Sequence, residues 1–247
     1  MKIIYPEIFS DIKSVSSLFT LANRGYGKNE KGLDLGLNTN SSDDDFNFNI
    51  AQLSKQSDVN LSDIALARQV HGKRVQTIQK AGIYDDVDGF VTSKSNLALA
   101  IQVADCAAIL VADPRNRVIG AFHAGWRGAV SGIIPNGIQM MKSLGAEPKH
   151  MRVYVSACIS LESFEVGPEV ANQFPSSFCD YKTYEKPHVD LKAFLNHQHS
   201  EFDIPQSQIQ ISKDCTMLND QYFSFRRERE NAGRMLAVIM LNEIFDT

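Results

Sequence analysis

Two apolar runs that end in chemically reactive side chains constrain the fold of this chain more than any other feature. The first run, residues 97–111, is rich in β-forming side chains and is interrupted by Asp105 and Cys106. Residues 113–116 (DPRN) are typical of a turn, and a second apolar run then leads directly into His123. Polar side chains within apolar strands cost free energy unless they are paired or ligated. The pattern therefore predicts strands that bring reactive groups to one place.

The other segments alternate between strand-like and helix-like patterns. Strands are predicted at residues 64–70, 74–79, 89–92, 152–157, 209–212 and 222–225, and one or two short ones within 1–22. Helices are predicted at residues 46–56, 129–144, 168–174 and 188–202. Residues 81–88 are predicted to form an acidic loop, and residues 234–244 fit a buried strand or a buried helix. Because several strands follow one another without a helix between them, we expect an α+β (α/β) fold with a mixed sheet.

Composition narrows the class of protein. The 247 residues are 43% hydrophobic and 22% charged, which is typical of a globular chain, and no linker or repeat divides them. We therefore predict a single catalytic domain over residues 1–247. The net charge of −4 provides no basic field for binding nucleic acid.

The same sequence predicts a soluble, cytoplasmic protein without membrane association. No uncharged apolar run reaches the roughly 18 residues that a membrane helix needs, and Pro6, Glu7 and Asp11 interrupt the first segment where a signal peptide is apolar. The four cysteines are widely spaced without a CxxC pair, which favours reduced thiols over a disulfide framework.

His71, Cys106 and His123 are the candidate metal ligands. Two imidazoles and a thiolate bind zinc well, and three protein ligands with an open fourth position are typical of a catalytic site. The spacings of 35 and 17 residues match no zinc finger or ribbon. Packing or simple hydrogen bonding at strand ends is the alternative interpretation of these three residues.

The neighbouring residues extend this candidate site. Asp105 is interpreted as a catalytic carboxylate, either orienting a ligand or acting as a general base, with turn capping as the alternative. Gly125 and Gly128 permit close backbone approach, and Arg127 is suited to binding an anion. Trp126, the only tryptophan, is equally consistent with a core position.

Motifs along nearly the whole chain resemble the YfiH-like family, once called polyphenol oxidases or laccase-domain proteins and now described as purine nucleoside phosphorylases. The most specific is HAGWRG at residues 123–128, preceded by Ala104-Asp105-Cys106 and by Gln69-Val70-His71-Gly72. Further matches in the family's order are Arg24-Gly25, Leu35-Gly36-Leu37, Asp88-Gly89-Phe90-Val91-Thr92, Phe164-Glu165-Val166-Gly167, Asp190-Leu191, Cys215-Thr216, Phe223-Ser224-Phe225-Arg226-Arg227 and Gly233-Arg234-Met235.

This resemblance implies a layered α/β/β/α-type domain with mixed sheets and a zinc ion bound by His71, Cys106 and His123. It implies phosphorolysis of adenosine, inosine, guanosine and 5'-methylthioadenosine, so that purine nucleosides and phosphate are the partners. It also implies a further adenosine deaminase activity. Departures from the family pattern occur at residues 162–167, at Phe225 within Ser224–Arg227 and at Ala232 before Gly233-Arg234, and they affect the rim of the substrate site.

Phosphorolysis requires a cationic subsite for phosphate, and arginine binds two phosphate oxygens at once. Arg226, Arg227 and Arg234 are the first candidates, followed by Arg127 and Arg24. Alternation along a strand at residues 222–225 would direct Arg226 and Arg227 to opposite faces, so at most one enters the pocket. A solvated surface is the alternative for this charged run. Deamination would need an acid or base, for which Glu165 and Asp105 are candidates.

Three other functions compete with this interpretation. Cys106 and His123 could form the nucleophile and base of a metal-free hydrolase with His71 as the orienting group, including an amidase that edits peptidoglycan precursors. A copper polyphenol oxidase is less favoured, because a multicopper centre needs about ten histidine ligands and the chain has six histidines. A zinc-stabilised binding module would leave the open coordination position without a use.

Overall fold

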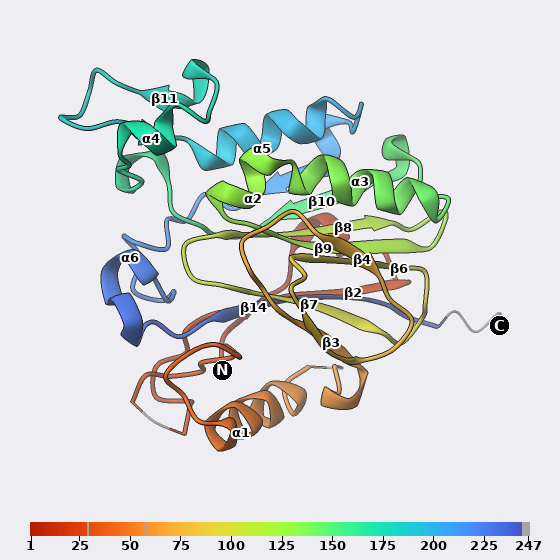
Figure 1. Ribbon diagram of the computed structural model, residues 1–247. Coiled ribbons are helices and arrows are strands. Elements are labelled where there is room, and N and C mark those ends of the chain that lie inside the picture. Colours follow the sequence, from red (N-terminus) through yellow and green to blue (C-terminus); the bar gives the residue numbers. More distant parts are fainter. Residues whose placement is uncertain (29, 58, 244–247) are drawn as a thin grey trace.

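Two six-stranded sheets pack face to face between two layers of helices in this computed structural model, which describes residues 1–28, 30–57 and 59–243 (Figure 1). The first sheet has the order β1 (Ile3–Ile4), β2 (Val15–Thr20), β14 (Met235–Leu241), β7 (Ala98–Val103), β3 (Ile64–Arg68), β5 (Gly82–Asp85). The second has the order β13 (Ile209–Ile211), β10 (Arg152–Val155), β8 (Ala107–Asp113), β9 (Val118–Ala124), β6 (Gly89–Thr92), β4 (Val75–Thr77).

Both sheets are mixed, as predicted. In the first, β14 is antiparallel to β2 and β7, whereas β3 is parallel to β7 and β5. In the second, β8 is antiparallel to β9 and β10, whereas β13 is parallel to β10. A separate two-stranded ribbon pairs β11 (Cys179–Asp180) with β12 (His188–Val189).

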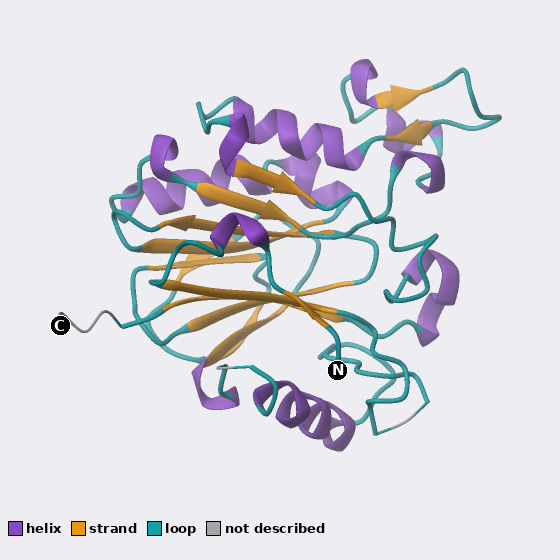
Figure 2. Cartoon of the chain, turned by 180° about the vertical axis from the view of Figure 1, so that it is seen from behind, coloured by secondary structure: helices purple, strands orange, loops and turns teal. Residues whose placement is uncertain are grey.

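Helices cover the outer face of each sheet. Figure 2 shows one group of helices against the second sheet and a single long helix, α1 (Asp43–Ser54), against the first. The other helices are α2 (Trp126–Ser131), α3 (Ile133–Ser143), α4 (Pro168–Ala171), α5 (Leu191–Ser200) and α6 (Phe225–Glu228). Short 3₁₀ helices lie at Glu7–Phe9, Leu61–Asp63, Pro148–His150, Leu161–Ser163, Ser176–Phe178, Gln206–Gln208 and Arg229–Asn231.

Three apolar cores separate these layers, and strand alternation explains them. In β8, Leu110 points into the core between the sheets, whereas Ile109 and Val111 point toward α3 and α5. In β7, Ile101 belongs to the core between the sheets and Ala100 to the core beneath α1. Because both faces of both sheets are buried, their strands read as continuous apolar runs. The predicted α/β/β/α layering is confirmed.

Several predicted boundaries are wrong, and each has a local cause. The run 97–111 forms two strands, since residues 104–106 make a tight turn in which Asp105 has φ 78°. The helix predicted at 129–144 is two helices, because Gly132 has φ 92° and ends α2. The predicted loop 81–88 contains the edge strand β5.

Two further differences bear on the site. No strand forms at 222–225; Ser224 instead caps α6 by accepting a hydrogen bond from the Arg227 backbone N–H. The helix predicted from residue 188 starts at Leu191, after β12. The last element is the strand β14, and the end of the predicted segment at Ile244 lies outside the described residues.

Within the described part of the chain, every helix is too short or too polar to cross a bilayer.

Candidate metal and substrate site

The three predicted metal ligands come together at one end of the second sheet. Cys106 directly precedes β8, His123 lies in β9, and the two strands pair with Ala107 opposite Ala124. His71 follows β3 of the other sheet, in a left-handed conformation with φ 60°. The ligand atoms of the three side chains lie within 4.8 Å of one another, so one ion can contact all three.

Asp88 holds both histidines in place, and the sequence analysis did not assign it this role. Its carboxylate accepts the Nδ1–H of His123 at 2.9 Å and the backbone N–H groups of His71 and Gly72 at 2.9 and 2.7 Å. Because Nδ1 of His123 is occupied, Nε2 is the nitrogen left for a metal. A carboxylate on the second ring nitrogen fixes the tautomer and the orientation of a metal-binding histidine.

The charges of the cluster favour an ionised thiol. Burial opposes ionisation of Cys106, but the charges and hydrogen bonds of His123 and His71 outweigh burial and lower the pKa of Cys106 to about 6. Burial likewise opposes protonation of His123, but Cys106 and Asp88 raise the pKa of His123 to about 9. A thiolate is the form of cysteine that binds metals or acts as a nucleophile.

Space for an ion depends on Gly125. A Cβ atom at this position would lie 2.8 Å from the Cys106 sulfur and 3.3 Å from Cδ2 of His71, so any side chain would intrude on the cluster. His123 is buried, Cys106 is partly buried and His71 is exposed, which leaves the cluster accessible from one side. The donor set, its oriented imidazole and this open side fit a metal with a free coordination position.

The cluster opens into a cavity of about 410 Å³ with apolar and polar walls. Three of the four arginines predicted to bind substrate line this cavity, and one does not. Those that line it are Arg127, Arg226 and Arg234. Apolar and aromatic side chains complete the walls, namely Val103, Ala104, Trp126, Ile159, Phe164, Leu191 and Phe225. The size suits a ligand as large as a nucleoside.

The three arginines differ in how many of their N–H groups are free. Arg127 is exposed and its guanidinium stacks 4.4 Å from the Trp126 ring, with no hydrogen-bond or ion-pair partner among the described residues. Arg226 donates to the carbonyl of Glu165 at 3.0 Å. Arg234 donates to two carbonyls, at residues 232 and 233. Arg127 therefore has the largest capacity to bind an anion.

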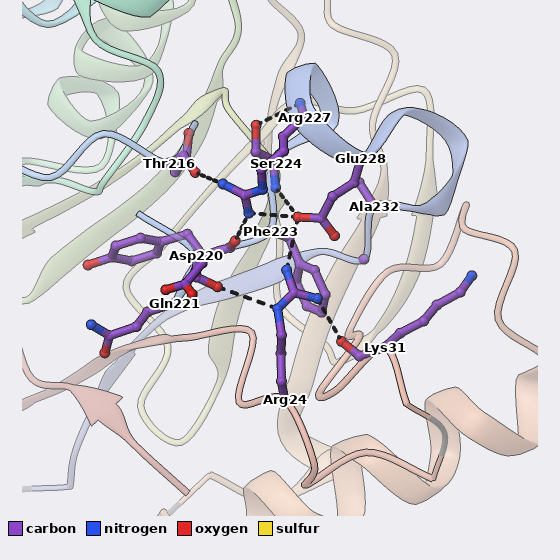
Figure 3. Close-up of polar contacts among 12 residues, drawn as sticks. Arg24, Lys31, Thr216, Asp220, Gln221, Phe223, Ser224, Arg227, Glu228 and Ala232 are labelled. Carbon is purple, nitrogen blue, oxygen red and sulfur yellow. Dashed lines mark hydrogen bonds and ion pairs between the residues drawn. The ribbon is translucent and has the colours of Figure 1, made fainter. Parts of the chain in front are cut away.

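Arg227 does not line the cavity, and its guanidinium is hydrogen-bonded to neighbouring segments of the protein. Its guanidinium donates to the carbonyls of Thr216, Met217 and Tyr222 and to the carboxylate of Glu228 at 2.7 Å. Figure 3 shows Arg227 and Arg24 meeting at Glu228, to which Arg24 donates at 3.0 Å. Both arginines thereby connect α6 to other segments instead of facing the cavity.

Asp105 lines the cavity, but its carboxylate is already bound on both oxygens. It accepts hydrogen bonds from Thr216 Oγ1 at 2.6 Å, Ser224 Oγ at 3.0 Å and the Arg226 backbone N–H at 2.6 Å. Asp105 thus connects the turn that carries Cys106 to the first turn of α6. The carboxylate that orients a histidine is Asp88, whereas a catalytic role for Asp105 stays a prediction.

Glu165 is exposed and does not line the cavity, and it forms a surface ion pair with Lys186 at 2.8 Å. One feature of the sequence points to Asp88, a charged residue directly before the apolar strand 89–92, and the structure shows its side chain fully buried. A buried carboxylate needs donors, and His123 and the backbone N–H groups of residues 70, 71 and 72 provide them.

The family described as multi-copper polyphenol oxidoreductase laccase matches residues 16–242. The chain belongs to this family, the YfiH-like family. A protein from Deinococcus radiodurans named purine nucleoside phosphorylase is 36% identical over 212 residues, which cover 83% of this chain and 82% of that protein. A protein of the same name from Bacteroides thetaiotaomicron is 33% identical over 67% of this chain and 64% of its own length.

Solved structures of the YfiH-like family have the same fold. Bacillus licheniformis hypothetical protein YfiH superposes with a TM-score of 0.89 at 25% identity, covering 97% of this chain and 96% of that one. YlmD from Geobacillus stearothermophilus superposes with a TM-score of 0.87 at 26% identity, covering 94% and 93%. The family resemblance inferred from the motifs is confirmed.

Proposed function

We propose that this protein is a zinc-dependent purine nucleoside phosphorylase acting on adenosine, inosine, guanosine and 5'-methylthioadenosine. The observation that carries the proposal is the opening of the His71–Cys106–His123 cluster into a cavity that also presents the guanidinium of Arg127, which has no hydrogen-bond or ion-pair partner among the residues that the structure describes. The names of the relatives support this reaction, since they describe purine nucleoside phosphorylases. Phosphorolysis needs an anchored phosphate, a ribose with developing positive charge and a stabilised leaving base.

Zinc is the ion proposed for His71, Cys106 and His123. When bound, it would supply Lewis acidity to a ligand atom at its open position. One imidazole–thiolate cluster is found among the described residues, whereas a multicopper centre needs many more histidines. Metal analysis of the purified protein tests this assignment: one zinc per chain supports it, and stoichiometric copper contradicts it.

The protein's own residues have three roles in the proposed reaction. Arg127 binds phosphate through its free N–H groups, with Arg226 and Arg234 completing a cationic wall. Asp88 keeps the proton of His123 on Nδ1. Phe164, Leu191 and other apolar side chains exclude water from the reacting region, which strengthens the electrostatic contacts inside it.

Phosphate dependence is the decisive test of the reaction. The zinc-loaded protein is incubated with adenosine, with and without phosphate, and the products are separated. Adenine and ribose 1-phosphate that form only with phosphate support the proposal. Inosine would reveal the deaminase activity that the family resemblance implies, and the absence of both products would overturn the proposed function.

Arg127 and Arg227 provide a matched pair of variants. We expect Arg127→Ala to raise the KM for phosphate roughly tenfold or more, because a charge-assisted contact contributes about 1.5–3 kcal/mol. Arg227→Ala should raise the KM for phosphate less, up to about fivefold, because Arg227 acts only through the position of α6, and it should lower the melting temperature, since its contacts are internal. Initial rates against phosphate at saturating nucleoside measure both. An unchanged KM in Arg127→Ala would place phosphate elsewhere.

A metal-free cysteine hydrolase is the second candidate function, and the lowered pKa of Cys106 favours it. A thiolate beside a protonated His123 is the arrangement of a cysteine nucleophile with its acid–base partner. An amidase that edits peptidoglycan precursors would use the same pair. Activity that survives complete removal of metal by a chelator would support this candidate over the phosphorylase.

A further inference from the structure

Carboxamide side chains form a second polar region of the cavity, which the roles described above leave unused. Gln69 and Gln102 lie in this wall together with Asn38. They come from the end of β3, from β7 and from the loop after Leu37. A neutral carboxamide offers both donors and acceptors, and nucleobase edges are commonly read by such groups. Phosphate, in contrast, is bound by cations.

The side chain of Gln69 holds the backbone of Gln102 in place through two hydrogen bonds. Its Nε2 donates to the Gln102 carbonyl at 2.8 Å, and its Oε1 accepts from the Gln102 backbone N–H at 2.8 Å. These two bonds continue the connection between β3 and β7 beyond their last paired residues, Ala65 and Leu99. The backbone of Gln102 is therefore fixed to Gln69, which precedes His71 by two residues in the chain.

The side chain of Gln102 is oriented by one contact and unpaired at the other end. Its Oε1 accepts the backbone N–H of Leu37 at 2.9 Å, which assigns the opposite end of the amide to Nε2. Gln102 is only 8% exposed, and its Nε2 has no hydrogen-bond partner within the described part of the chain. A buried donor without an acceptor costs free energy that a ligand acceptor atom would recover.

We infer that Gln102 reads the purine base and makes this site prefer 6-oxopurine over 6-aminopurine nucleosides. This inference rests on the proposed function and adds a substrate preference to it. A carboxamide with a free oxygen pairs with N6 and N7 of adenine, but Oε1 of Gln102 is engaged by Leu37. The remaining N–H donors of Nε2 instead match the acceptor O6 of a 6-oxopurine. A 6-aminopurine presents an N–H donor in place of O6, so that two donors would face each other.

Kinetic discrimination between inosine and adenosine tests the inference. In Gln102→Glu the acceptor for Leu37 remains and the two donors are replaced by an acceptor oxygen. We expect the ratio of kcat/KM for inosine to that for adenosine to fall at least about tenfold. The ratio is independent of the fraction of active protein. Gln102→Met, which adds no charge, should also lower this ratio. It replaces Gln102→Glu as the test variant if Gln102→Glu folds poorly.

Gln173→Glu is the matched control, since Gln173 is exposed and lies outside the cavity wall. Its ratio should equal that of the wild type. A wild-type ratio near one, or an equal fall for both nucleosides in Gln102→Glu, would overturn the inference while leaving phosphorolysis intact.

Titration calorimetry of the zinc-loaded protein with inosine and with adenosine separates this failure from failure of the proposed function. Tighter binding of inosine that is lost in Gln102→Glu supports the subsite even if no base is released. Equal affinities, or no binding of either nucleoside, overturn it. Absence of phosphate-dependent base release in the wild type counts only against the proposed reaction.

Discussion

Two walls meet at the cavity and are built in different ways. We call them the metal-ligand wall, with the proposed ligands His71, Cys106 and His123, and the arginine wall, with Arg127, Arg226 and Arg234. The metal-ligand wall rests on sheet: His123 lies within β9, Cys106 adjoins β8, and Asp88 stands directly before β6. The arginine wall rests partly on a short segment: α6, which carries Arg226, has four residues and is held by side chains that bond to backbone. Strand pairing thus fixes the positions of Cys106 and His123, and a backbone hydrogen bond to Asp88 fixes that of His71. The position of Arg226 depends instead on a small network around Asp105. Substitutions should therefore separate metal binding from phosphate binding.

The largest effect is expected from breaking the metal-ligand wall itself. Cys106→Ser replaces a thiolate ligand with a hydroxyl, so we expect zinc affinity to fall by more than about 100-fold and phosphorolysis to be lost. Metal content after dialysis and activity should fall together. Cys179→Ser is the control, since Cys179 lies outside the cavity. Stoichiometric zinc in Cys106→Ser would favour the cysteine nucleophile.

An intermediate effect is expected from the support of that wall. Asp88→Asn removes the charge that orients His123, so zinc affinity should fall about 10- to 100-fold. Asp113→Asn is a matched control, because Asp113 is also fully buried and also accepts backbone N–H groups, but lies at the far end of β8. Both variants should be less stable, and only Asp88→Asn should lose zinc in a chelator competition. Equal losses of zinc would show that general destabilisation is the cause.

The smallest effect is expected in the arginine wall. Ser224→Ala removes the cap of α6 and one of the hydrogen bonds to Asp105, a loss of about 1 kcal/mol. Because the first turn of α6 carries Arg226, the KM for phosphate should rise up to about fivefold, with zinc content unchanged. Ser143→Ala, at the exposed end of α3, is the control. A loss of zinc in Ser224→Ala would mean that the two walls are not independent.

The metal-ligand wall was largely predictable from sequence, and the arginine wall was not. Strand periodicity predicts where β8 and β9 run, and reactive residues at their ends then have to meet because antiparallel neighbours share an edge. The sequence predicts that at most one of Arg226 and Arg227 enters the cavity; Arg226 lines it and Arg227 does not, but the strand from which this was argued does not form. The two side chains diverge on a short capped helix, not on a strand.

Hydrogen bonds between distant residues account for what the sequence could not predict. Asp88 lies 35 positions from His123, and Asp105 lies 121 positions from Arg226. Local pattern carries no information on such pairs. It also cannot separate the free guanidinium of Arg127 from the saturated one of Arg227, since both occur in short polar segments next to apolar runs.

The place of β14 in the sheet has a consequence during synthesis on the ribosome. This strand, Met235–Leu241, lies between β2 and β7 and is hydrogen-bonded to both. A nascent chain that has not yet released residue 241 therefore exposes two apolar strand edges, which are templates for aggregation. A chain that ended before residue 235 would keep all three proposed metal ligands but would leave the edges of β2 and β7 open to pairing with other chains.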